Sequence, residues 1–132
     1  MQIYYFTRTG RSKEIAEQLA NRYDTTARVI EDHKNWEGKI NYLKAGAMAS
    51  SGRSIPADYI SPDLQDDIVV VFPLWAGAMP PAVKTFVEAV GREHITAVVT
   101  SLGSVLRQRE GFKKVIDLVG KEIAVPDDKL LH

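Results

Sequence analysis

The sequence predicts an α/β protein in which a parallel β-sheet lies between two layers of helices. Strand-like apolar runs alternate with segments of helical spacing, residues 68–72 form a continuous and mostly β-branched run, and glycine or proline stands at several boundaries. A continuous β-branched run is typical of a central parallel strand buried on both faces. Alternating strands and helices favour right-handed connections between parallel strands, so we expect five strands and four helices in three layers.

The N-terminal half is expected to contain two strands and two helices. Residues 3–6 are the first strand, residues 12–23 the first helix, and residues 27–30 a short second strand. The apolar stripe of the first helix is Ile15, Ala16, Leu19, Ala20 and Tyr23. A second helix is predicted from the spacing of Trp36, Ile40, Leu43 and Ala47. The Ser-, Gly- and Pro-rich residues 50–62 then form a loop.

The third strand, residues 68–72, is expected in the middle of the sheet. Pro80 and Pro81 open the next helix, because proline is tolerated in a first turn, and Gly91 ends it. Residues 95–100 form the fourth strand.

The C-terminal part is predicted as one more helix and one more strand. Helical spacing of Phe112, Val115, Ile116 and Val119 predicts a fourth helix that ends at Gly120. Residues 122–125 then form the fifth strand. A basic patch is expected to be a solvated face of the fourth helix: Arg107, Arg109, Lys113 and Lys114.

Composition limits the class of protein. The 132 residues suit a single domain, residues 1–132, with a proper core. Lys plus Arg equals Asp plus Glu at 17 each, so no global field attracts nucleic acid or a membrane surface. The chain has no cysteine, and its three histidines are scattered, so we expect no disulfide and no metal site. Without a signal peptide or a membrane-spanning run, the expected location is the cytoplasm.

The turn after the first strand is the most informative feature of the sequence. Residues 7–12, Thr-Arg-Thr-Gly-Arg-Ser, join a strand directly to an amphipathic helix. Unpaired N–H groups and the helix dipole stabilise an anion at a helix N-terminus, hydroxyl groups add donors, and Gly10 allows close approach. The sequence therefore predicts a phosphate-binding loop, with the alternative that Thr9 or Ser12 only caps the helix.

Ligands of such folds lie beyond the carboxyl ends of the strands, so the loops at 73–80 and 101–104 belong to the same predicted site. Trp75 follows a buried strand in a Pro- and Gly-rich loop, where we expect its ring to stack on a flat conjugated ligand, with a ring folded back onto the domain as the alternative. Gly77 either permits rotation of a peptide beneath the ligand or only makes a turn.

With these three loops, the chain resembles the flavodoxin-like flavoproteins. Residues 7–12 are similar to the family's phosphate loop, residues 73–80 to its second loop, which places an aromatic residue over the flavin, and residues 101–104 lie where its third loop contacts the ring. The resemblance implies strand order 2-1-3-4-5, noncovalent FMN, and a role in electron transfer or as a small FMN-dependent oxidoreductase. The implied cofactor contacts are Thr7, Arg8, Thr9, Gly10, Arg11, Ser12, Leu74, Trp75, Ala76, Gly77, Ser101 and Gly103.

The resemblance also implies a redox partner protein or a small electron acceptor, and no catalytic acid or base among the side chains. Arg8 and Arg11 depart from the family pattern, because uncharged residues are usual there. We expect them to point into solvent, as such loop positions tend to face outward, with pairing to the phosphate as the alternative. A cofactor-free interaction or regulatory module with the same fold is the alternative function.

Only seven residues follow Val125, so the C-terminal helix usual in the family is expected to be missing. An apolar face of the sheet over the third to fifth strands would then be bare, and parallel sheets normally need cover on both faces. A homodimer or a docked partner helix is one way to supply that cover. The alternative is that Leu130 and Leu131 fold back as a short flap, which would cover only the fringe of the face.

Overall fold

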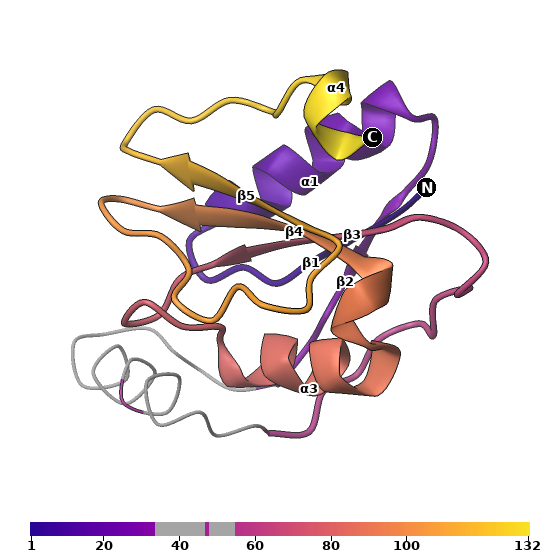
Figure 1. Cartoon of the computed structure of the whole chain (residues 1–132), viewed down its shortest axis with the longest axis horizontal. Coiled ribbons are helices and arrows are strands. Elements are labelled where there is room, and N and C mark those ends of the chain that lie inside the picture. Colours follow the sequence, from indigo (N-terminus) through magenta and orange to yellow (C-terminus); the bar gives the residue numbers. More distant parts are fainter. Residues whose placement is uncertain (34–46, 48–54) are drawn as a thin grey trace.

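The computed structural model describes residues 1–33, 47 and 55–132. Within these residues the chain forms a three-layer α/β sandwich, with α1 on one face of a five-stranded sheet and α3 on the other (Figure 1). Residues 34–46 and 48–54 lie outside the description, and with them most of the predicted second helix and the start of the loop after it.

The sheet is parallel throughout and has the predicted strand order, β2-β1-β3-β4-β5. Its strands are β1 (Gln2–Tyr5), β2 (Ala27–Val29), β3 (Ile68–Pro73), β4 (Ile95–Ser101) and β5 (Lys114–Val119). The five apolar residues of β3 are at most 2% exposed, as expected for a central strand covered on both faces.

Two helices of ordinary length pack on this sheet, α1 (Arg11–Arg22) and α3 (Pro81–Val90). Ile15, Ala16, Leu19 and Ala20 of α1 are buried, so the predicted stripe is the packed face. Helix α3 begins at the second of its two prolines, as predicted, and Gly91 follows its last residue with φ +100°. A short 3₁₀ turn, η1 (Arg92–His94), leads into β4.

The prediction for the C-terminal part was wrong. Residues predicted as the fourth helix form β5, and residues 122–125, predicted as the fifth strand, are in neither a helix nor a strand. Apolar residues at 115, 116, 118 and 119 fit a short strand as well as a helical stripe. Pairing with the free edge of β4 decides between the two, and Gly111 and Gly120, both with positive φ, leave only eight residues between them.

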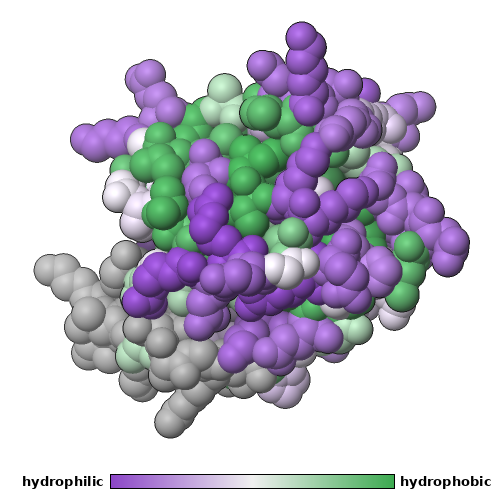
Figure 2. Space-filling model, in the orientation of Figure 1, coloured by the Kyte–Doolittle hydropathy of each residue, from purple (hydrophilic) through white to green (hydrophobic). Residues whose placement is uncertain are grey.

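Most of the α1 face of the sheet is covered by the chain itself, so the face predicted to be bare is only partly exposed. After β5 the chain returns over this face and ends in a single helical turn, α4 (Asp128–Leu131) (Figure 1). Ile123, Val125 and Leu131 pack there with α1, β3 and β4. A bare apolar face, which was the reason for expecting a homodimer, is therefore largely absent. Apolar surface remains between this C-terminal segment and the edge strand β5 (Figure 2).

On the α3 face, the connection between β4 and β5 takes the place of a helix. Residues 102–113 are just long enough to cross between neighbouring parallel strands. Leu106, 1% exposed, packs in the same cluster as Val83 and Phe86 of α3, and Phe112 is partly buried against it. Within the described part of the chain, no helix is long and apolar enough to cross a membrane.

Candidate functional site

A cavity of about 450 Å³ opens at the carboxyl end of the sheet. It lies where β1, β3 and β4 end, and the loops after these three strands are the ones selected from the sequence. Its lining residues are Arg8, Thr9, Arg11, Pro73, Leu74, Trp75, Ala76, Gly77, Thr100, Ser101, Leu102, Gly103 and Ser104. Parallel strands bring these loops together because all their carboxyl ends meet at one edge of the sheet.

The first loop presents the start of α1 to the cavity. Gly10 precedes the helix with φ +96°, a conformation that favours glycine, and no side chain caps this helix end in the described structure. The Thr7 hydroxyl accepts a hydrogen bond from the Gly10 N–H at 2.9 Å, so it supports the loop from within. The first N–H groups of α1 therefore have no side-chain acceptor here, which suits an anionic ligand.

The side chains of the first loop divide into two groups. Arg8, Thr9 and Arg11 line the cavity, whereas Ser12 is 1% exposed, and its hydroxyl lies 2.9 Å from the Thr100 hydroxyl. This bond ties the first turn of α1 to the end of β4. Arg11 donates to the carbonyl oxygen of Gly120, beyond β5. Thr7, Gly10 and Ser12 are thus not among the residues that line the cavity.

The second loop contains a tight turn. The N–H of Trp75 donates to the Ala78 carbonyl at 2.9 Å, and the Ala78 N–H donates back at 3.1 Å. The two residues between them have positive φ, +51° at Ala76 and +78° at Gly77, as a two-residue hairpin turn requires. The positive φ of this turn therefore explains glycine at position 77.

Trp75 forms part of the inner wall of the cavity. Its side chain is 4% exposed and belongs to the α3-side core, with its ring 5.4 Å from that of Phe6 in an edge-on arrangement. The ring is therefore folded back onto the domain, which is the alternative to the predicted stacking. Because so little of the indole is exposed, stacking on a ligand would need its ring to turn.

The third loop is held by its own serine. The Ser101 hydroxyl donates to the Ser104 carbonyl at 2.5 Å. Leu102, in between, is 68% exposed and borders the cavity. Ser101 and Gly103 were selected from the sequence, but the neighbouring Leu102 and Ser104 were not.

Pro73 and Thr100 also line the cavity without having been selected. They are paired across β3 and β4 near the ends of these strands. Their position at the strand ends was a signal in the sequence, since a parallel sheet places its ligand there. Among the described residues, the cavity lining includes two arginines and no acidic residue, a local asymmetry that the balanced net charge conceals.

Two solved structures resemble this one over most of its length. A flavoprotein from Lactobacillus acidophilus, crystallised in complex with FMN, matches with a TM-score of 0.63 at 14% identity, over 89% of this chain and 90% of that chain. A protein named as a flavoprotein from Bacteroides uniformis matches with a TM-score of 0.68 at 22% identity, over 92% and 90%. The chain has a flavodoxin-like fold. No protein-family model and no curated protein sequence matches it significantly.

The flavodoxin-like fold accounts for the position of the cavity but not for its ligand, because one fold serves many functions. Which ligand the cavity can bind depends on the chemistry of the residues in the three loops.

Proposed function

We propose that this protein binds FMN noncovalently in the cavity and uses it in electron transfer or as a small FMN-dependent oxidoreductase. The observation that supports this most is the meeting of three loops around about 450 Å³, with an uncapped helix start and two arginines at the first of them. One solved structure with this fold is a flavoprotein in complex with FMN.

The first loop fits the phosphate group. The N–H groups of the first turn of α1 supply donors and a positive dipole end, and Thr9 adds a hydroxyl. Arg8 and Arg11 place positive charge at the same cavity, which suits a phosphate dianion. Because both arginines line the cavity, we now favour pairing with the phosphate over the solvent-facing role expected from the sequence.

The second and third loops fit the flavin ring. Leu74, Trp75 and Leu102 supply apolar surface, and the backbone of residues 76–77 and 101–104 supplies polar groups near it. Bound FMN would supply the redox chemistry, accepting and passing on electrons. The protein's part is to bind the ring, orient it and limit its contact with water, so we assign no side chain as a catalytic acid or base.

The direct test is a titration of the purified protein with FMN, followed by visible absorbance and flavin fluorescence. We expect saturable one-to-one binding. The double variant Thr9→Ala with Gly10→Val should bind FMN at least about a hundredfold more weakly, because it removes a hydroxyl donor and forces a β-branched residue to φ +96°.

Lys13→Ala is the matched control for this variant, because Lys13 lies on the same helix, is half exposed, and does not line the cavity. Equal loss in the control and the double variant, or no FMN binding by the wild-type protein, would contradict the proposal.

A cofactor-free interaction or regulatory module is the second candidate function. Two contacts favour it: Trp75 is buried against Phe6, and Arg11 donates a hydrogen bond to the Gly120 carbonyl. In both cases a side chain expected to contact the cofactor already has a partner within the protein. Thermal unfolding separates the two candidates. A ligand at 100 times its dissociation constant stabilises the folded state by about 2.7 kcal/mol, so an unchanged melting temperature in excess FMN would favour the module.

A further inference from the structure

Arg107 contacts the turn of the second loop from outside the cavity. It lies in the connection between β4 and β5, in the segment that the sequence predicted as a solvated helix face. The structure has no helix there, and each of the four basic residues of that patch donates a hydrogen bond to another part of the chain: Arg107, Arg109, Lys113 and Lys114.

Arg107 holds both carbonyl groups of the turn. Its guanidinium Nη2 donates to the Ala76 oxygen at 2.8 Å, and its backbone N–H donates to the Gly77 oxygen at 3.2 Å. The side chain also lies directly over Gly77, where an added Cβ would stand 2.9 Å from Arg107 Nε. Rotation of the peptide between Ala76 and Gly77 would break the bond from the guanidinium.

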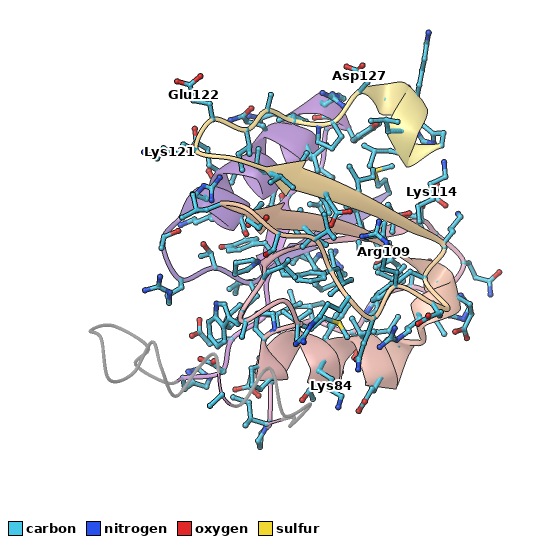
Figure 3. All side chains as sticks on the ribbon, turned by 60° about the vertical axis from the view of Figure 1, so that its left-hand side comes forward. Lys84, Arg109, Lys114, Lys121, Glu122 and Asp127 are labelled. Carbon is cyan, nitrogen blue, oxygen red and sulfur yellow. The ribbon has the colours of Figure 1, made fainter. Side chains whose placement is uncertain are left out.

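The backbone on either side of Arg107 is fixed by β5. Asp117, whose side chain is 15% exposed, accepts a hydrogen bond from the Leu106 N–H at 3.2 Å through Oδ1. Its Oδ2 accepts one from Arg109 at 2.7 Å, and Arg109 also donates to the Leu106 carbonyl. Figure 3 shows Arg109 on the connection beside β5. Strand β5 thus positions Arg107, which in turn holds a turn with two positive φ angles.

We propose that Arg107 is a positioning residue of the candidate flavin site, which fixes the Ala76–Gly77 turn and places a permanent positive charge behind it. This inference rests on the proposed function. A guanidinium stays charged at every physiological pH. Because reduction adds electrons to the flavin, a fixed cation behind this wall of the cavity favours reduced FMN over oxidised FMN.

The first experiment measures the dissociation constants of oxidised and photoreduced FMN under anaerobic conditions. In Arg107→Gln, which loses the charge and keeps a donor, we expect the ratio of the reduced to the oxidised constant to rise about tenfold. This corresponds to a two-electron potential lower by about 30 mV. Arg107→Lys keeps the charge and should retain most of the wild-type ratio.

Lys113→Gln is the matched control, because it removes one positive charge from the same connection at a residue that pairs with Asp67 and does not line the cavity. Equal ratios in Arg107→Gln and Lys113→Gln, with FMN still bound, would overturn the inference and leave the proposed function intact.

The second experiment needs no flavin. In a Trp36→Phe background, Trp75 is the single tryptophan of the chain. We expect acrylamide to quench its emission at least twofold more efficiently in Arg107→Ala than in the wild-type sequence, because the turn loses the guanidinium hydrogen bond to the Ala76 carbonyl and the packing of the side chain over Gly77. Unchanged quenching would overturn the role of Arg107 in holding the turn, whether or not FMN binds. Failure of the wild-type protein to bind FMN would overturn the proposed function and the flavin part of the inference together.

Discussion

Ser12 illustrates at the residue scale how a motif residue is used differently from its expected role. The sequence predicts its hydroxyl as a phosphate donor, but in the structure that hydroxyl bonds to Thr100, 88 positions away in the chain. The loop pattern shows that a hydroxyl group is present, but it does not show which group that hydroxyl bonds to in the folded protein. Thr9, one residue before Gly10, is exposed at the cavity and is the hydroxyl available to a ligand.

Replacing Ser12 by alanine should therefore affect folding more than FMN affinity. The change leaves the Thr100 hydroxyl, 1% exposed, without its partner, and an unsatisfied buried polar group costs about 1–3 kcal/mol. Urea unfolding checks this value, and an FMN titration of the same variant should give an affinity within about threefold of wild type. A stable variant that no longer binds FMN would show instead that the Ser12 hydroxyl serves the ligand.

Among the helices and strands, the sequence correctly predicted those whose local residue pattern allows one structure. The stripe of α1, the prolines of α3 and the continuous run of β3 each had a local physical reason, and the structure confirms them. The segment 114–119 has no such reason, because its apolar residues suit two structures. Only the free edge of β4, a feature of the folded molecule, selects a strand. Because residues 122–125 were predicted as a strand, the sequence did not predict the C-terminal segment that packs on the α1 face.

Contacts between this C-terminal segment and α1 include a titratable pair. The Tyr23 hydroxyl donates to Asp128, and this hydrogen bond lowers the pKa of that carboxyl below its ordinary value. Burial raises the pKa of Tyr23 above its ordinary value of 10.0, and the bond to Asp128 raises it further. A depressed carboxyl pKa stabilises the fold at pH values above the unfolded pKa of about 3.9 and ceases to do so as the pH falls through the folded value. A raised tyrosine pKa stabilises the folded state below the unfolded pKa of about 10, and this stabilisation is lost as the pH rises through the folded value.

Tyr23→Phe should accordingly lower the melting temperature at pH 7 and make no difference well below pH 4, where Asp128 is protonated in both states. Calorimetry of the variant and the wild-type protein across this range measures the difference. A deficit that stays constant down to pH 2 would mean that it does not depend on the ionised Asp128 carboxylate, because the variant keeps the ring and loses only the hydroxyl.

On the scale of the whole molecule, a balanced composition conceals an uneven arrangement of charge. The chain has 17 basic and 17 acidic residues, yet the described residues that line the cavity at the carboxyl end include Arg8 and Arg11 and no acidic residue. A second, smaller cavity of about 250 Å³ lies between α1 and the turn after β5, and it includes Glu14 and Glu122. Figure 3 places Lys121 and Glu122 in that turn. An anionic ligand is therefore expected to prefer the first cavity.

An amide ¹H–¹⁵N NMR titration of the protein with FMN tests whether the three loops bind this cofactor. We expect the largest shift changes in three separate segments, residues 8–13, 73–77 and 100–104, with the N–H groups of Arg11, Ser12 and Lys13 among them. The smaller cavity serves as an internal control, since Gln18 and Ile123 line it and should shift little. A spectrum that does not change with excess FMN, or changes confined to residues 14–18 and 121–123, would contradict FMN binding by these loops.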